Sequence, residues 1–194
     1  MAVETALLTV DAGELAVLEV RRRDAKGWAL PGTFLHEGER LIDGVLRSLV
    51  ESASVHGLRP RQLHVFDDPT RDVGRWVLSI AHVDVVTHEH LTSRSLEDTR
   101  LMPVENPGRL PYGHGEIVQR AVRDLRTRYE TAPDPDRLLP DTFSLRELRR
   151  IHELVAGRSL QRDTFRRTMA AHLVATGVSS PGTRGRPAQT FRRR

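Results

Sequence analysis

The feature that most restricts the fold of this chain is a glycine-bearing loop followed by a helix with a single apolar stripe. The loop runs from Gly32 to Glu39, and the next segment carries apolar residues three and four positions apart between Leu41 and Ala53. That spacing places these residues on one face of a helix, which must pack against another layer of structure. His56-Gly57, with Pro60 beyond, ends the segment.

Short runs of strand-forming residues surround this helix and predict a sheet. Two of them are separated by a turn-like Asp-Ala-Gly-Glu and predict a hairpin. Residues 76–86 are apolar nearly throughout, which predicts a central strand. We expect strands at 5–10, 15–21, 28–30, 62–66 and 76–86, loops with at most one edge strand over 87–111, and a second amphipathic helix over 115–130.

The loop and helix together resemble the Nudix box. That box has a glycine loop and a glutamate, followed by a helix reading Arg-Glu-apolar-x-Glu-Glu-x-Gly. This chain keeps Gly32, Glu39, Arg47 and Glu51 in the same frame, although Ser54 replaces the last glycine. The resemblance implies a Nudix α/β/α sandwich over residues 1–132.

Two of the three acidic positions on that helix are serine here. In an active Nudix enzyme the positions of Ser48, Glu51 and Ser52 carry carboxylates, which share one helix face and hold Mg²⁺ against a diphosphate. A neutral hydroxyl is a poor magnesium ligand. We therefore expect no catalytic residues, no metal and no cofactor, and we expect Glu51 to pair with Arg47 one turn away.

A pocket that has lost its metal acids can still bind its former type of ligand. The candidates are Trp28 for stacking, Arg71 and Arg75 for phosphates, and His114, just before a helix, for a phosphate or a ribose. Each has a structural alternative. Trp28 can close the edge of the sandwich, and Arg71 can pair with Asp67, Asp68 or Asp72.

The charge of the chain changes sign near residue 136. Residues 1–136 carry 17 basic and 22 acidic residues, whereas residues 137–194 carry 13 arginines and four acidic residues. A genome that favours arginine codons explains why Lys26 is the only lysine, but it does not explain this clustering. The contrast predicts two modules with different partners. Residues 132–136, rich in proline and aspartate, are the candidate linker to a domain at 137–194.

The basic module predicts two short helices and a hairpin-like tail. The first helix starts at Asp141 or Ser144 and ends near Ala156, and the second runs from about 161 to 176 with Phe165, Met169, His172 and Leu173 inward. A winged helix has this order and places its second helix in the major groove of double-stranded DNA. The alternative is a solvated helix face and tail. The candidate DNA-binding residues are Arg162, Thr164, Arg166, Arg167, Arg184, Arg186 and Gln189.

This module is similar to the C-terminal domain of the Nudix-related transcriptional regulators of NAD metabolism. The shared segments are Phe-Ser-Leu-Arg-Glu-Leu at 143–148, Phe-Arg-Arg at 165–167 and Gly-Arg-Pro-Ala-Gln at 185–189, while Thr164 stands where relatives often have asparagine. The resemblance implies an α+β chain: a Nudix sandwich followed by a winged helix-turn-helix domain. It also implies a homodimeric repressor of NAD biosynthesis or salvage genes, which binds a palindromic operator and senses ADP-ribose or a related NAD derivative.

Two alternatives remain open. One is an active Mg-dependent Nudix hydrolase of ADP-ribose-like substrates, which holds its metal with Glu39, Glu51 and Glu37. The other is a sugar-responsive repressor of the same architecture. The chain has no cysteine, no signal-peptide pattern and no apolar stretch near the ~20 residues that cross a bilayer. We therefore expect a cytoplasmic protein with no membrane partner.

Overall fold

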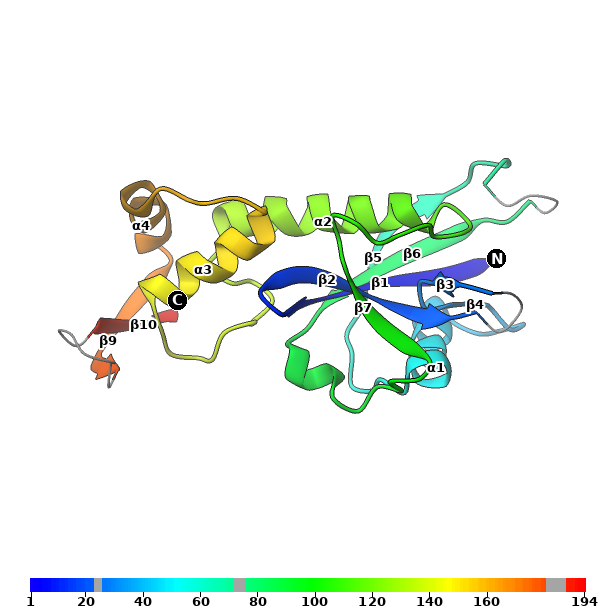
Figure 1. The fold of residues 1–194 in the computed structure, drawn as a ribbon, viewed down its shortest axis with the longest axis horizontal. Helices are drawn as coiled ribbons and strands as arrows, with labels where there is room; N and C mark the ends of the chain where they lie inside the picture. Colours follow the sequence, from blue (N-terminus) through cyan, green and yellow to red (C-terminus); the bar gives the residue numbers. More distant parts are fainter. Residues whose placement is uncertain (23–25, 72–75, 181–187) are drawn as a thin grey trace. The chain divides into compact units, whose positions relative to one another are not determined.

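The chain folds into two compact units, Met1–Val122 and Arg123–Arg194. The computed structural model describes residues 1–22, 26–71, 76–180 and 188–194 (Figure 1). The boundary between the units falls inside helix α2 (His114–Thr131), so this helix contributes residues to both of them.

A mixed sheet, seven-stranded in the described residues, forms the first unit. Its path is β3-β2-β1-β6-β5, with β4 paired to the start of β1 and β7 paired to β2. Among the described strands of this sheet, only β1 and β6 run parallel. The predicted hairpin and the central position of the strand after residue 76 are confirmed. The strands are β1 (Ala2–Asp11), β2 (Glu14–Arg21), β3 (Trp28–Ala29), β4 (Gly32–Phe34), β5 (Arg61–Phe66), β6 (Ser79–Val85) and β7 (Thr99–Pro103), and a 3₁₀ turn η1 (His88–Leu91) precedes β7.

Helices lie on both sides of this sheet (Figure 1). β1 is buried at every position from Ala2 to Thr9, without the alternation of a half-exposed strand, so both of its faces are covered. Helix α1 (Leu41–Ala53) packs Val45 and Leu49 into the core cluster that also contains residues of β1 and β2. The first turns of α2 bury Ile117 and Val118. The predicted α/β/α sandwich is therefore confirmed.

The residue that follows helix α1 shows why the Nudix box normally has a glycine at this position. Ser54 is left-handed, with φ at 58°, and its N–H points to the carbonyl oxygens of Leu49 and Val50. A non-glycine residue pays about 1–2 kcal/mol for this conformation. The glycine of the Nudix box avoids this conformational cost, whereas Ser54 in this chain incurs it.

A winged helix makes up most of the second unit. Helix α3 (Leu145–Ala156) begins with a capping box, in which the Ser144 hydroxyl accepts from the Glu147 N–H and the Glu147 carboxylate accepts from the Ser144 N–H. Gly157, with φ at 67°, ends the helix as predicted. The sheet beside it has the antiparallel order β8-β10-β9, from β8 (Phe143–Ser144), β9 (Leu173–Ser180) and β10 (Ala188–Arg193).

The arginine-rich helix is shorter than the sequence predicts. Helix α4 covers Arg162–Ala170, His172 is exposed rather than inward, and Leu173 opens strand β9. Phe165, Met169 and Leu173 are spaced by four residues and all three are buried, so helical periodicity alone extends the helix too far. Leu173 forms part of a strand rather than of the helix because it pairs with Arg193 of β10, a partner distant in the sequence.

A fully buried carboxylate fixes the segment predicted to be a linker. Asp134 accepts from the Tyr129 hydroxyl at 3.0 Å and from the backbone N–H groups of Leu138 and Leu139, each at 2.8 Å. It also pairs with the guanidinium of Arg193 at the end of β10. Residues 132–136 are neither helix nor strand, as expected, but these bonds anchor them within the second unit.

Replacing Asp134 by alanine is expected to lower the free energy of unfolding of the second unit by about 3–5 kcal/mol. The reason is that the Arg193 guanidinium and two backbone N–H groups lose a shared, buried acceptor. Urea denaturation of the full chain, with hydrogen exchange at second-unit amides, measures the change. Asp141→Ala is the matched control, because that side chain is 91% exposed, and it should change stability by less than about 0.5 kcal/mol. Equal unfolding midpoints for the two variants would contradict this account.

Candidate ligand pocket and DNA-binding surface

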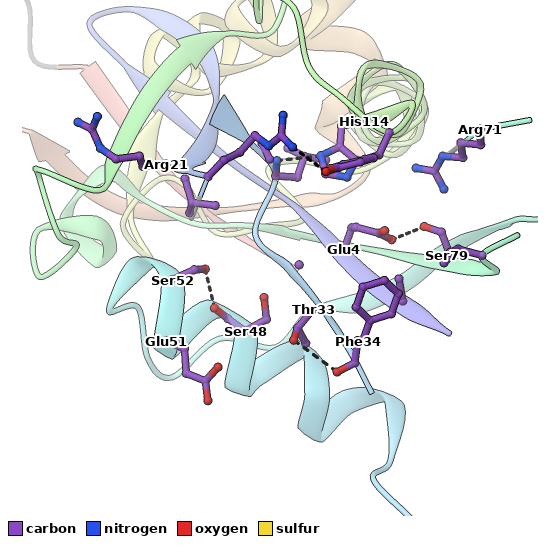
Figure 2. Close-up of a pocket in the computed structure, with 18 residues that line it drawn as sticks. Glu4, Arg21, Thr33, Phe34, Ser48, Glu51, Ser52, Arg71, Ser79 and His114 are labelled. Atoms are coloured by element: carbon purple, nitrogen blue, oxygen red, sulfur yellow. Dashed lines mark hydrogen bonds between the residues drawn. The ribbon is translucent and has the colours of Figure 1, made fainter. Parts of the chain in front are cut away.

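A pocket of about 650 Å³ opens beside β4 in the first unit. Its volume lies within the range of nucleotide-sized ligand sites. In Figure 2, Ser48, Glu51 and Ser52 of α1 form one group, and Glu4, Ser79, Arg71 and His114 form another, with Thr33 and Phe34 of β4 between them. The pocket combines cations, acids and aromatic rings, with Arg21, Arg22, Arg71, Glu4, Glu51, Phe34 and Tyr112 all in its lining.

The face of α1 toward the pocket carries the two serines and a single carboxylate. Ser52 Oγ donates to the Ser48 carbonyl oxygen at 2.6 Å, and Ser48 Oγ is buried with no hydrogen-bond partner in the described part of the chain. Glu51 Oε2 lies 3.5 Å from Arg47 Nη1, so the predicted ion pair is confirmed. Within the described residues, no group of three or more His, Asp or Glu side chains is placed to hold a metal ion.

The Glu39–Arg47 pair joins the glycine loop to the helix. Arg47 donates to both Glu39 carboxylate oxygens, at 2.8 Å each, and the His36 N–H donates to the same carboxylate at 2.9 Å. These donors, Arg47 first, lower the pKa of Glu39 to about 2. Neither residue lines the pocket. These two retained motif residues therefore hold the scaffold of the pocket together.

His114 lies in the pocket wall, as predicted, at the start of α2. The Leu30 N–H donates to His114 Nδ1 at 3.0 Å, so the neutral ring carries its proton on Nε2. Burial, helped by the positive charges of Arg71 and Arg22, lowers the pKa of the ring to about 3. His114 therefore presents a neutral N–H donor rather than a positive charge.

Two arginines of the pocket lie against aromatic rings. The Arg71 guanidinium lies 4.5 Å from the centre of the Phe66 ring, and Arg22 donates to the Tyr112 hydroxyl at 2.7 Å. Gly113 makes room for Arg71, because a Cβ there would stand 2.8 Å from Arg71 Nε. Arg71 is thus in the predicted place, whereas Arg22 and Tyr112 were missed, since nothing in the sequence marks them as neighbours.

Trp28 does not line the pocket. The guanidinium groups of Arg100 and Arg21 lie 4.6 and 5.1 Å from the centre of its ring, and Arg100 also pairs with the buried Glu19. This arrangement gives Trp28 a packing function at the β3 edge, which is the structural alternative considered above. Arg75, the other predicted phosphate ligand, lies outside the described residues.

The predicted DNA-binding face of α4 is exposed. Arg162, Thr164, Arg166 and Arg167 lie on the surface, while Phe165 and Met169 are buried beneath them. Gln161 caps this helix by accepting from the Thr164 N–H, a function the sequence analysis missed. Gln189 is exposed on β10, and Arg184 and Arg186 lie outside the described residues.

The two units therefore define a class of protein, in which a Nudix-type pocket domain is joined to a winged-helix domain. The Nudix domain model matches residues 2–121, and the model described as the NrtR DNA-binding winged helix domain matches residues 136–193. The chain belongs to the Nudix family, and its two domains are those of the NrtR-type regulators. No helix among the described residues is long and apolar enough to span a membrane.

Relatives with both domains support this classification. The chain is 28% identical over 203 residues to the "ADPR responsive transcriptional repressor NtrR" of Acinetobacter baylyi. This match covers 99% of this chain and 81% of that protein. Shewanella oneidensis NrtR, solved with a 27mer DNA, matches with a TM-score of 0.82 and 27% identity, over 100% of this chain and 93% of that one. The NUDIX domain of Shewanella NrtR, solved with ADP ribose, matches 64% of this chain and 86% of that one, with a TM-score of 0.56 and 26% identity.

The His114 ring is expected to stay neutral, with its proton on Nε2, from pH 7 down to about pH 5, because its pKa is about 3. An unfolded histidine takes up its proton near pH 6.5. The free energy of unfolding therefore keeps the contribution of His114 above pH 6.5 and loses it as the pH falls toward 3. Ring ¹H–¹⁵N correlation spectra across a pH titration measure both the tautomer and the pKa.

The variant His114→Gln serves as the control for stability. Its melting temperature should fall less steeply between pH 6.5 and pH 5 than that of the unmodified protein. A His114 ring that titrates near 6.5, or equal slopes for the two proteins, would contradict the buried, neutral state.

Proposed function

We propose that this protein is a DNA-binding transcriptional repressor of NAD biosynthesis or salvage genes whose pocket senses ADP-ribose or a related NAD derivative. The observation that carries the proposal is the pairing of two features in one chain. A cation-rich pocket faces a Nudix helix that has lost most of its acids, and an arginine-studded helix lies exposed on a winged-helix domain. The first feature suits recognition of a nucleotide, and the second suits recognition of DNA.

The chemistry of the pocket matches the parts of ADP-ribose. Arg22 and Arg71 suit its two phosphates, and the His114 Nε2–H suits a phosphate or ribose oxygen. Tyr112, on the pocket wall, suits stacking with a base. The structure of the similar Shewanella domain with ADP ribose supports the same ligand class here.

Recognition without cleavage follows from the α1 face. Ser48 and Ser52 replace two of three metal ligands, and the remaining Glu51 pairs with Arg47. Magnesium requires several hard anionic oxygens, which this face does not supply. We infer that the pocket binds its ligand and releases it intact.

Coupling between ligand and DNA is proposed to run through α2. This helix supplies His114 to the ligand pocket and Tyr129 to the core of the second unit. A ligand that prefers one of two positions of His114 favours the corresponding position of α2, and this helix contributes residues to both units. We propose this route in place of the proline-rich segment at 132–136, because Asp134 fixes that segment within the second unit. We keep 1–132 and 137–194 as the proposed domain limits, and a homodimer on a palindromic operator as the proposed assembly.

The first test is a fluorescence-anisotropy titration of DNA from upstream of the protein's own gene and its neighbours. Arg166→Ala is expected to weaken binding by about 1–3 kcal/mol if its side chain reads a base. Binding should also fall steeply with salt, because several arginine–phosphate contacts release counterions. Arg59→Ala, an exposed arginine of the first unit, is the matched control and should leave binding unchanged.

The same titration separates the effector classes. ADP-ribose is expected to change the affinity for DNA, and pentoses are expected to have no effect. An effect of pentoses alone would favour the sugar-responsive alternative. Equal binding by Arg166→Ala and the unmodified protein would remove Arg166 from the DNA-binding face.

The second test concerns magnesium and hydrolysis. The unmodified protein is expected to leave ADP-ribose intact in the presence of Mg²⁺, whereas Ser48→Glu/Ser52→Glu should bind Mg²⁺ and gain hydrolysis that EDTA abolishes. Calorimetric titration with Mg²⁺ and chromatography of the products measure both. Because Ser48 is buried, Ser52→Glu alone, at a half-buried position, gives an independent measure of metal binding. Turnover by the unmodified protein that disappears in Glu51→Ala would favour the hydrolase alternative.

A further inference from the structure

Two glutamates are buried in the sheet of the first unit, and among the described residues only one of them has a cation as a hydrogen-bond partner. Glu19 of β2 is 0% exposed and accepts from Arg100 at 2.8 and 2.9 Å. Glu4 of β1 is 8% exposed, and its hydrogen bond within the described residues comes from the hydroxyl of Ser79. Buried carboxylates are normally paired with a positive charge, so Glu4 needs another explanation.

The surroundings of Glu4 direct it into the ligand pocket. Glu4 and Ser79 both line the pocket, on the neighbouring strands β1 and β6 (Figure 2). Gly32, the first glycine of the motif, pairs with Glu4 across β1 and β4, and a Cβ at Gly32 would stand 2.9 Å from the Val3 carbonyl oxygen and 3.0 Å from Glu4 Cγ. A side chain at position 32 would therefore push on the backbone of β1 as well as on Glu4, so this glycine allows the close approach of β4 that leaves Glu4 in the pocket wall.

Burial has a cost for this carboxylate. Burial raises the pKa of Glu4, while the Ser79 hydroxyl and the charge of Arg71 oppose the rise. A carboxyl group kept at such a position lowers the stability of the unliganded protein, and this pattern is typical of residues that serve binding rather than folding.

We propose that Glu4 selects the ligand by accepting a hydrogen bond from a hydroxyl or amine group of the nucleotide, at a subsite that excludes phosphate. The inference rests on the proposed function, because it assumes that a nucleotide occupies the pocket. Ser79 Oγ orients one carboxylate oxygen of Glu4, and the other is the acceptor for the ligand. A ribose hydroxyl and the adenine amine are the donors that ADP-ribose offers.

The subsite distinguishes ligands by charge as well as by hydrogen bonding. A phosphate group beside a buried carboxylate meets like-charge repulsion in a medium of low polarity. A nucleotide that carries an extra phosphate on the hydroxyl bound by Glu4 is therefore rejected, while the unphosphorylated form is retained. Glu4 acts in this scheme as a specificity determinant opposed to the arginines of the same pocket.

The experiment compares two probes, ADP-ribose and inorganic pyrophosphate, by calorimetric titration of the full chain. Glu4→Gln keeps the shape of the side chain and removes its charge. It is expected to weaken ADP-ribose binding by about 10- to 100-fold, because a charge-assisted hydrogen bond is lost. Pyrophosphate binding should stay equal or become tighter, because a negative charge has left the pocket. Glu14→Gln, an exposed glutamate of β2, is the matched control.

A merely structural function of Glu4 would produce a different pattern. If Glu4 only stabilised the fold, Glu4→Gln would lower the melting temperature and weaken both probes together. We expect an unliganded melting temperature that is unchanged or higher. Ser79→Ala, which removes only the orienting hydroxyl, should weaken ADP-ribose and spare pyrophosphate, and it provides a second variant if Glu4→Gln folds poorly.

Two analogues identify the donor group. ADP-ribose 2′-phosphate tests the adenosine ribose, and the hypoxanthine analogue of ADP-ribose tests the amine. The analogue that Glu4→Gln binds as tightly as the unmodified protein does, or more tightly, names the group that Glu4 contacts, and a phosphate on that group should bind Glu4→Gln more tightly because the like-charge repulsion is gone. If both analogues still bind Glu4→Gln more weakly, the donor is on the terminal ribose.

The failures of the two proposals are distinguishable. ADP-ribose that binds Glu4→Gln as tightly as the unmodified protein, or a parallel loss of both probes, overturns the assignment of Glu4 alone. An unmodified protein that binds no ADP-ribose overturns the proposed function, and the assignment of Glu4 with it.

Discussion

The complete burial of β1 is the constraint on which the rest of the first unit depends. From Ala2 to Thr9 every residue is covered, so this strand requires neighbours on both edges and helices on both faces. β2 and β4 share one edge of β1 and β6 runs along the other, which brings the glycine loop and the start of β6 to the same end of the strand. The pocket lies at that end. A polar residue placed there on β1 must face either the core or the pocket, and Glu4 lines the pocket.

Carboxylates that are buried or partly buried have different uses in this chain. The Glu39–Arg47 pair joins a loop to a helix, and Asp134 ties the segment after α2 to the last strand through Arg193. Glu19 is neutralised by Arg100, which also covers Trp28. Glu39 and Asp134 are satisfied by these partners, whereas Glu19 uses only Oε2, and its Oε1 is buried without a hydrogen bond among the described residues. Glu4 differs from these carboxylates because it lines the open ligand pocket.

Sequence reasoning recovered the features that depend on local periodicity and motif spacing. The stripe of α1, the exposed arginines of α4 and the serines in the pocket were all predicted correctly, because each follows from the 3.6-residue repeat of a helix. The end of α4 was wrong, and the pocket lining does not include Trp28, for which packing at the sheet edge was the alternative. Both depend on partners far away in the sequence, Arg193 for Leu173 and Arg100 for Trp28. Glu4 left one usable signal, as the only acidic residue in the apolar run from Ala2 to Val10.

The sequence by itself determined the two-domain class of this protein, the two serines on the motif face of α1 and the arginine face of α4. These are properties of residue identity and of short-range spacing, which a helix preserves whatever surrounds it. Only the tertiary structure decided which polar groups meet in the pocket, that His114 is a neutral donor, and that Asp134 holds the predicted linker in place. The physical reason is that burial and hydrogen bonding between distant segments set the charge and orientation of a side chain, and neither exists until the sheet has formed.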